Sequence, residues 1–415
     1  MARPLPRGAT ASHHRSLHFE ESGFQGIGDD DVTEEGGLRE MKPTRKFRST
    51  LTVLGVTALA ASLLIAWGSA SSASPTRASH ASSAKKFLAC EVTDTGGIND
   101  RSFNASAYKG LQEAAAADPS ISYKFLSSSS TSDYTPNINT FIGEKCGIII
   151  TVGYDMADAT QTAAKAHPSQ KFAIVDYTYS PTIKNVLALH YDTNQDAFLG
   201  GYLAAAMSKT GKVGTFGGQD IPTVTIYMDG WVAGVRYYDK VHHAHVVALG
   251  WTPAKKRAPG SFAGTGLFTN DFTNQGLGKT DAATLMAEGA DVIFPVAGSV
   301  GLGAAAAVKQ AGGTNYMEWV DTDGCISAPQ YCSLFITSVT KGIVPSVKAA
   351  VLSAVHGTFK GGNYFGTLAN NGVGLSPYHD FQKKIPASVQ NEIKKLRTEI
   401  IAGKISIDPN SYPAS

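Results

Sequence analysis

Short apolar runs alternate with amphipathic stretches along most of the chain, from Lys85 onward. An uncharged run such as 147–152 predicts a buried strand, whereas 102–117, with apolar side chains at helical spacing, predicts a helix. Strands that alternate with helices in this way form parallel sheets covered by helices on both faces. The pattern occurs in two series of similar size, at about 86–190 and 195–320. We therefore expect an α/β fold with two doubly wound parallel-sheet lobes.

The rest of the chain predicts two further helices around a glycine-rich segment. Two lobes with a returning C-terminal segment are typical of a cleft that closes about a hinge. We expect the first lobe to comprise residues 85–192 and about 322–345. The second lobe should comprise residues 193–321 and about 346–408.

Ligands of doubly wound folds bind at the carboxyl ends of the strands, so residues that directly follow a predicted strand are candidates for a site. The positions that meet this condition are Asp94, Gly153, Asp176, Gly217, Gly298 and Asp321. The loop that begins at Asp94 stands out because residues 94–104 spell DTGGINDRSFN, a string dense in glycine and short polar side chains. An ordinary turn, with Asn99 or Asp100 capping the next helix, is the alternative explanation.

The N-terminal residues follow a different pattern. Residues 1–40 are polar, rich in glycine and charge, and lack a hydrophobic period, so we expect a disordered extension. From Met41 a basic segment is followed by a 17-residue uncharged run, 51–67, and then by small residues. This is the order of a secretory signal sequence, and the run also reaches the lower length limit of a membrane-spanning helix.

Residues 41–84 therefore predict an exported protein, in which this segment is a cleaved signal or, alternatively, an uncleaved membrane anchor. The stretch 74–84 is rich in serine and alanine and predicts a flexible tether to the folded part. No cysteine lies between Leu51 and Phe87, so the usual lipid attachment site of a bacterial lipoprotein is missing. The true start of the chain, Met1 or Met41, stays open.

Charge and composition exclude several classes of function. The 415 residues carry a formal net charge of +2, without the basic stripe that nucleic-acid binding requires. The histidines 242, 243 and 245 have no carboxylate at ligand spacing, so we expect no metal. Residues 278–280 lack the earlier glycine of a phosphate-binding loop. We expect a binding protein without cofactor or catalysis; the carboxylates after the strands leave a hydrolase as the alternative.

Four cysteines remain for disulfides, which export would permit. Cys325 and Cys332 are close in sequence and could clip a short loop. Cys90 and Cys146 each lie in or beside a predicted strand, and those strands could be neighbours. The alternative is four buried free thiols, and the absence of a CxxC pair argues against zinc.

The string at 94–104 resembles the opening signature of the basic membrane protein family, the purine-nucleoside receptors of bacterial ABC importers. Further stretches resemble the family in the same order, at 217–234, 289–298 and 320–341, so the likeness covers roughly residues 86–405. The resemblance implies a fold like that of type I periplasmic binding proteins. It also implies a purine nucleoside in the cleft, an ABC permease as partner and, we expect, a monomeric protein.

Residue by residue, the resemblance implies a ligand set. Phe103 matches a position that stacks on the base, and Asn104 one that contacts its edge. Asp321 matches a carboxylate that accepts hydrogen bonds from ribose hydroxyls, and Lys341 its basic companion. The remaining candidates are two acidic positions, a second stacking aromatic and two positions on matching loops: Asp94, Asp176, Phe268, Tyr154 and Gly298.

The second stacking aromatic is the least determined of these, because the loop 266–272 departs from the family spacing. Phe268 is favoured over Phe272. A sugar or another small polar solute is the alternative ligand, since sugar receptors share the cleft and the stacking aromatics. A membrane-anchored sensor with the same fold is the alternative to a transport receptor.

Overall fold

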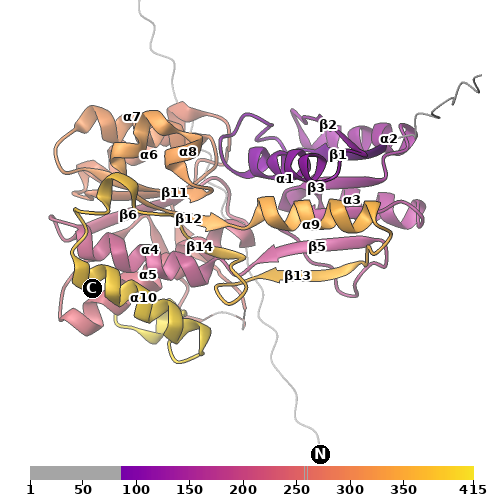
Figure 1. Cartoon of the computed structure of the whole chain (residues 1–415). Coiled ribbons are helices and arrows are strands. Elements are labelled where there is room, and N and C mark those ends of the chain that lie inside the picture. The colour runs from indigo at the N-terminus through magenta and orange to yellow at the C-terminus, as the bar shows by residue number, and fades with distance from the viewer. Residues whose placement is uncertain (1–85, 257, 259) are drawn as a thin grey trace, which may run out of the picture. The chain divides into compact units, whose positions relative to one another are not determined.

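The computed structural model describes residues 86–256, 258 and 260–415, so the expectations for residues 1–84 lie outside the described part. Two six-stranded sheets organise this part of the chain (Figure 1). The elements around the first sheet are called lobe 1 here, and those around the second sheet lobe 2. This architecture confirms the predicted α/β fold of two doubly wound lobes.

All six strands of lobe 1 are parallel, in the spatial order β13-β5-β4-β3-β1-β2. Helices α1 and α9 cover one face, where Leu111, Val347 and Ile150 belong to the same hydrophobic core, and helices α2 and α3 cover the other. The bounds are β1 (Phe87–Val92), β2 (Ile121–Leu126), β3 (Ile148–Val152), β4 (Phe172–Val175), β5 (Val186–Tyr191), β13 (Gly362–Gly366), α1 (Phe103–Ala117), α2 (Tyr134–Gly143), α3 (Ala157–Ala166) and α9 (Ile343–Val355).

Lobe 2 repeats this design with one antiparallel edge strand, in the order β14-β12-β11-β10-β6-β7. Its strands are β6 (Lys212–Gly217), β7 (Val247–Leu249), β10 (Val292–Val296), β11 (Tyr316–Asp321), β12 (Phe335–Lys341) and β14 (Val373–Leu375), with a separate hairpin β8 (Trp251–Pro253) and β9 (Gly264–Gly266). Its helices are α4 (Asn194–Met207), α5 (Pro222–His242), α6 (Gln275–Ala287), α7 (Val300–Ala311), α8 (Gly324–Ser327) and α10 (Ala387–Ile401). Helices α4 and α5 lie on one face of the sheet, and α6 and α7 on the other.

The returning C-terminal segment is divided between the lobes differently from our expectation. We expected residues 322–345 in lobe 1, but β12 pairs with β11 and β14 in the second sheet. We expected residues after 346 in lobe 2, but α9 and β13 belong to lobe 1, and only β14 and α10 return to lobe 2 (Figure 1). Helix α9 is held there by close packing: a Cβ added at Gly110 of α1 would lie 2.8 Å from the Val347 side chain.

Within the described residues the chain crosses between the lobes at 192–193, 342 and 367–372. Backbone hydrogen bonds tie the crossings together, from Asp192 N to Gly366 O and from Gly342 N to Gly372 O, both 2.8 Å long. Gly366 and Gly372 approach so closely that a side chain on either would meet the other's backbone. These crossings form a hinge whose backbone segments need glycine to pass one another.

The four cysteines form two disulfides, and both are pairings that the sequence left open as possibilities. Cys90 of β1 is joined to Cys146, two residues before β3, with Cα atoms 6.1 Å apart. Cys325 and Cys332 clip the short loop after β11, with Cα atoms 4.5 Å apart. No helix of residues 86–415 combines the length and the apolar character that a membrane span requires.

Candidate functional site

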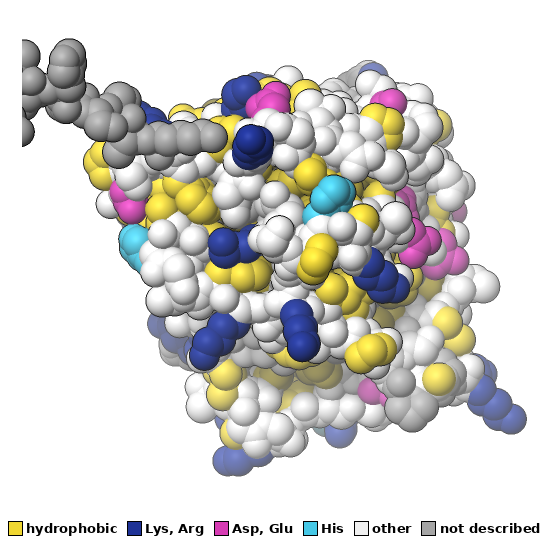
Figure 2. Space-filling view, turned by 90° about the vertical axis from the view of Figure 1, so that its right-hand side faces the viewer, with side chains coloured by type: hydrophobic (Ala, Val, Ile, Leu, Met, Phe, Trp, Pro, Cys, Tyr) yellow, Lys and Arg dark blue, Asp and Glu magenta, His cyan; other side chains and the backbone are white. Residues whose placement is uncertain are grey.

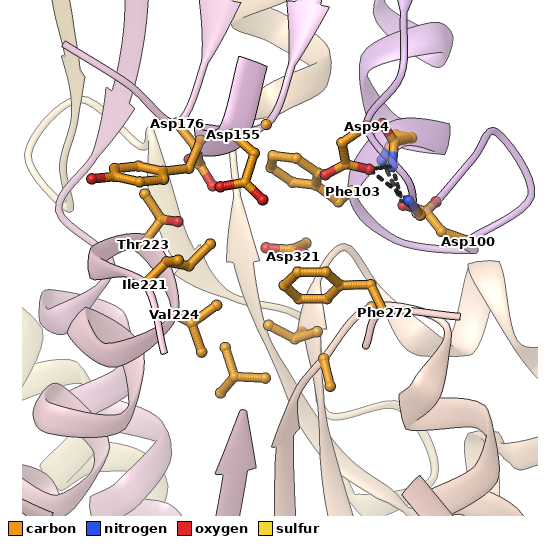
Figure 3. A pocket seen from close by; sticks show the side chains of 18 of the residues that line it. Asp94, Asp100, Phe103, Asp155, Asp176, Ile221, Thr223, Val224, Phe272 and Asp321 are labelled. Atoms are coloured by element: carbon orange, nitrogen blue, oxygen red, sulfur yellow. Dashed lines mark hydrogen bonds between the residues drawn. The ribbon is translucent and has the colours of Figure 1, made fainter. Parts of the chain in front are cut away.

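A cavity lies where the carboxyl ends of the two sheets face each other (Figure 3). Its space measures about 640 Å³, a figure that includes open solvent. Lobe 1 contributes residues that follow β1, β3 and β4, and lobe 2 contributes residues from β10, β11, the start of α5 and the loop before α6. The cavity is thus at the switch point where doubly wound folds place ligands.

The loop between β1 and α1 is fixed by two carboxylates. Asp100 acts as the cap of α1: its carboxylate accepts hydrogen bonds from the backbone N–H groups of Ser102, Asn104 and Ala105, at 3.0, 2.7 and 3.0 Å. Asp94 accepts from Gly96 N at 2.9 Å and from the Asn104 side-chain amide at 2.8 Å (Figure 3). The loop is therefore held by hydrogen bonds that orient Asn104 toward the cavity.

These bonds use only the donor end of the Asn104 amide. Its Nδ2 group donates to Asp94 and, at 3.1 Å, to Asp100. Its Oδ1 atom is buried and accepts no hydrogen bond from any described residue. A buried acceptor of this kind costs free energy unless a ligand or water supplies a donor. Asn104 thus lines the cavity with an Oδ1 atom that has no donor among the described residues.

Burial changes the acidity of both loop carboxyls. It raises the pKa of Asp94 to about 7, although hydrogen bonds from Asn104 and Gly96 act in the opposite direction. Burial also raises the pKa of Asp100 to about 6, although hydrogen bonds from the backbone N–H groups at the start of α1 lower it in part. The polar half of the cavity therefore contains carboxyls that titrate close to neutral pH.

A buried ion network joins the two lobes at the base of the cavity. Lys341 Nζ lies 2.6 Å from Asp176 Oδ2 and 3.4 Å from Asp321 Oδ1, and all three side chains are less than a tenth exposed. Asp321 also accepts from Tyr227 and Ser102, each at 3.0 Å. Burial alone would lower the pKa of Lys341, but the two carboxylates more than offset this and raise it. Lys341 is therefore a permanent cation here.

The two carboxylates of this network come from equivalent places in the two sheets. Asp176 follows β4 and Asp321 ends β11, and both have a left-handed backbone, with φ of 70° and 66°. This conformation is uncommon outside glycine and is retained mostly where function or packing compensates its cost. In both lobes the unusual backbone turns a carboxylate toward Lys341 at the bottom of the cavity.

Apolar side chains form the wall on the lobe 2 side. Ile221, Val224, Phe272, Val296 and Ala297 line it. Figure 3 shows Phe272 from lobe 2 and Phe103 from lobe 1 both extending into the cavity. Lys341 Nζ lies 4.9 Å from the centre of the Phe103 ring, which fixes that ring against the ion network. The cavity thus has two aromatic faces, one on each lobe.

Eight of the nine residues predicted for the site line this cavity: Asp94, Phe103, Asn104, Tyr154, Asp176, Gly298, Asp321 and Lys341. Phe268 does not line the cavity, so the preference for Phe268 over Phe272 as the second aromatic of the site was wrong. Its ring packs against Trp251, with ring centroids 5.9 Å apart, and also against Gly217. The backbones of Phe268 and Gly217 form an isolated β-bridge. Four residues further on, the loop has turned and Phe272 lines the cavity instead.

Sequence reasoning missed several lining residues, among them Asp155, Thr223 and Tyr227. Tyr227 looked like part of the apolar face of a helix, and its ring does pack in the core, next to Phe294 at 6.1 Å. Its hydroxyl nevertheless reaches Asp321. Asp155 directly follows the predicted candidate Tyr154, so the rule of strand ends could have included it.

One set of potential metal-binding side chains lies close together in the described part of the chain: Asp323, Cys325 and His379. Cys325 is joined to Cys332, so its sulfur is no thiolate ligand, and His379 is paired with Asp323 at 2.7 Å. These residues do not line the cavity. The cavity itself offers carboxylates, an amide, hydroxyls and aromatic rings, a set suited to binding an uncharged polar molecule.

The sequence is similar to known transport proteins over most of its length. The profile of the PnrA-like ABC transporter substrate-binding proteins, the Bmp family, matches residues 87–258 and 267–411. The "ABC transporter nucleoside-binding protein BmpA" of Lactococcus lactis is 30% identical over 332 residues, which are 76% of this chain and 87% of that protein. The "CD4+ T-cell-stimulating antigen" of Listeria monocytogenes is 29% identical over 372 residues, covering 84% and 97%.

The fold also has solved relatives. An ABC transporter solute-binding protein from Aeropyrum pernix K1 superimposes with a TM-score of 0.68 and 24% identity, over 77% of this chain and 92% of that one. A solute-binding protein from Conexibacter woesei gives 0.58 at 19% identity, over 79% and 100%. At these identities the likeness concerns the fold, and it agrees with two lobes that enclose a cleft.

Proposed function

Because the chain belongs to the Bmp family of PnrA-like ABC transporter substrate-binding proteins, we propose that its cleft binds a purine nucleoside. The bound nucleoside would then be presented to an ABC permease. The observation that carries the proposal is the arrangement of two aromatic rings and a buried carboxylate around one cavity. Phe103 and Phe272 enter from opposite lobes, and Asp321 lies at the base.

Each part of a nucleoside has a matching group. A base between the two rings would gain roughly 1–3 kcal/mol from stacking on each aromatic side chain. Its polar edge would meet Asn104 Oδ1 and the Asp94 carboxyl, which lie on the same loop. Ribose hydroxyls would donate to the buried carboxylates of Asp321 or Asp176, since charge-assisted hydrogen bonds are strong.

Three of the five carboxylates that line the cavity are engaged by protein groups, which supports binding without chemistry at these positions. Asp100 is engaged by the α1 cap, and Asp176 and Asp321 are engaged by Lys341. A hydrolase would need a carboxylate available to activate water. Incubation with inosine, followed by chromatography for free base, tests this part of the proposal, and any turnover would contradict it.

Titration calorimetry with nucleosides, free purine bases and pentoses tests the proposed ligand. We expect binding of at least one purine nucleoside, and weaker binding of the corresponding base. Binding of a pentose or hexose in preference to every nucleoside would establish the sugar alternative. No heat with any nucleoside would contradict the proposal.

Export remains part of the same proposal. The family consists of receptors that act outside the cytoplasmic membrane, and residues 41–67 have the order of a signal sequence or anchor. N-terminal sequencing of the protein recovered from cells distinguishes cleavage from anchoring. A cleaved terminus near residue 74 would favour a released receptor, and an intact Met41 an anchored one.

A further inference from the structure

Asp323, Cys325 and His379 form a set of potential metal ligands outside the cavity. Their oxygen, sulfur and nitrogen atoms all lie within 4.8 Å of one another. Carboxylate, thiolate and imidazole are the ligand types that bind zinc in proteins. Within residues 86–256, 258 and 260–415, no other group of three such side chains comes this close together. The bond from Cys325 to Cys332 is what keeps the sulfur from acting as a ligand.

The pair of His379 and Asp323 needs only a small movement to admit a metal ion. Nε2 of His379 lies 2.7 Å from Oδ2 of Asp323. Two such ligand atoms on a tetrahedral zinc ion are roughly 3.4 Å apart, because each bond is about 2.1 Å long. An ion can therefore replace the contact between the two side chains if these separate by less than about 1 Å.

The backbone that carries these ligands is held by contacts other than the disulfide. Asp323 Oδ1 accepts a hydrogen bond from Cys325 N at 3.0 Å. Phe381, two residues after His379, is fully buried and packs edge-on against Tyr316 of β11, with ring centroids 4.9 Å apart. Because a hydrogen bond and core packing fix the two segments, we expect the three ligands to stay close together when the sulfur–sulfur bond is broken.

Solvent reaches this set of side chains. Cys325 and Cys332 are half-buried, and the side chains of His379 and Asp323 are 31% and 15% exposed. Both cysteines of the other disulfide are buried, so a reductant meets the Cys325–Cys332 bond first. On the face of lobe 1 in Figure 2, the histidine side chains lie apart from one another, and the described residues of that face offer no comparable set.

We propose that reduction of the Cys325–Cys332 disulfide opens a zinc site whose protein ligands are Asp323, Cys325 and His379. A dithiol passes two electrons and two protons to the two cysteine sulfurs, and its own sulfurs join in a disulfide. Zinc then displaces the thiol proton of Cys325 into solvent, because the thiolate is the ligand. Water fills the fourth position, as in other zinc sites with three protein ligands. The role of Cys332 is to mask the site.

Zinc titration of the full chain, in competition with a chromophoric chelator, tests the proposal. The wild type is measured as oxidised protein and after reduction with dithiothreitol, which is removed by gel filtration under nitrogen. Cys332→Ser leaves the Cys325 sulfur permanently unmasked. Cys325→Ser loses the same disulfide together with the ligand, so the two variants form a matched pair.

Two histidine variants complete the set. His379→Gln removes a proposed ligand. His356→Gln is its control, because His356 also pairs with an aspartate, Asp118 at 3.3 Å, but lies outside the set of ligands. Cobalt in place of zinc gives a second readout, since bonding of a thiolate to cobalt produces an absorption band in the near ultraviolet.

We expect the reduced wild type and Cys332→Ser to bind one zinc ion at least about tenfold more tightly than the oxidised wild type. Loss of a group that only supports a zinc ligand costs roughly 10–100-fold in affinity, so the loss of a ligand in Cys325→Ser or reduced His379→Gln should cost at least as much. The cobalt band should appear in Cys332→Ser and be missing in Cys325→Ser. Reduced His356→Gln should behave as the reduced wild type.

Three results would overturn the proposal. These are equal zinc affinity in the oxidised and reduced wild type, equal affinity in Cys332→Ser and Cys325→Ser, and equal losses in His379→Gln and His356→Gln. Because both cysteine variants lack the disulfide, a general effect of losing it would appear in both. Zinc bound by the thiols of the other disulfide would persist in reduced Cys325→Ser and would also contradict the assignment.

Discussion

Lobe 1 brings the carboxyls of Asp94, Asp100 and Asp155 to the cleft, whereas lobe 2 faces it with Ile221, Val224 and Phe272. The two sheets have nearly the same topology, so the difference comes from the loops at the strand ends. Polar groups that need exact partners discriminate between ligands, while apolar surface contributes affinity with little selectivity. Lobe 1 is therefore expected to decide which base is accepted, and the apolar side chains of lobe 2 to hold it.

What the lobes share is the ion network between them. Asp176 and Asp321 occupy equivalent strand ends with the same left-handed backbone, and Lys341 contacts both. Lys341 ends β12 and directly precedes the crossing at Gly342. The ion network that connects the two lobes therefore lies directly beside one of the chain crossings of the hinge.

Removal of Lys341 from the ion network should have the largest effect of the changes considered. Lys341→Met would leave two carboxylates buried without their cation, and should lower the free energy of unfolding by about 3–5 kcal/mol. Chemical denaturation followed by circular dichroism measures the change. Lys348→Met is the matched control, because Lys348 is over a third exposed and pairs with Glu113 at 3.5 Å. That control should change the free energy of unfolding by less than about 0.5 kcal/mol, and a similar loss in both variants would contradict the bridging role.

Asp321→Ala tests the shared carboxylate from the ligand side. It removes the proposed acceptor of the ribose hydroxyls, and hydrogen bonds to a charged group contribute about 1.5–3 kcal/mol each. Nucleoside affinity should fall roughly 100-fold while affinity for the free base changes much less. Calorimetry with inosine and hypoxanthine measures both. Equal losses for the two ligands would show that Asp321 does not face the sugar.

Phe272→Ala tests the apolar half of the cavity. Loss of one stacking ring should weaken a nucleoside by about 1–3 kcal/mol, roughly fivefold to 150-fold. Because stacking is nearly indifferent to the base, the order of preference among nucleosides should stay the same. Phe268→Ala is the control, since this ring packs on Trp251 outside the cavity. It should lower the thermal midpoint, and a larger loss of affinity in this control than in Phe272→Ala would restore Phe268 to the site.

The acidic half predicts a pH dependence of stability. The pKa of Asp94 is raised by burial to about 7, so the folded protein retains a proton there that the unfolded chain releases above about pH 4. The stabilisation is complete below that value and is lost as the pH rises to about 7, by at most about 1.4 kcal/mol per pH unit. Denaturation between pH 4 and 8 should show a flatter profile for Asp94→Asn than for the wild type. Asp380→Asn, which changes an exposed carboxyl, should follow the wild type, and parallel profiles for all three proteins would contradict the assignment.

Strand ends were the most informative feature of the sequence. Apolar runs located β1, β4 and β11, and the acids that follow or end them, Asp94, Asp176 and Asp321, do line the cavity. The rule works because parallel strands bring their carboxyl ends to one edge of a sheet. The local pattern of apolar residues was therefore sufficient to predict that these three acids lie in the site.

Other features depended on contacts that spacing does not encode. The loop before α6 has no period, so Phe268 and Phe272 could not be distinguished until the turn between them was known. The passage from β12 to α9 takes a single residue, Gly342, and gives no linker signal, which led to the wrong division of the C-terminal segment. Tyr227 was hidden because a tyrosine in a helical apolar face gives no sign of what its hydroxyl contacts.

The divided C-terminal segment also constrains the order in which the protein can be made. Lobe 1 lacks an edge strand and the helix that covers α1 until residues 343–366 are available. Lobe 2 lacks β14 and α10 until residues 373–401 follow. During synthesis or export from the N-terminus, neither lobe can complete its sheet before most of the chain has emerged. The two lobes must therefore mature almost together, and a protein truncated after β12 would contain two unfinished sheets instead of one finished lobe.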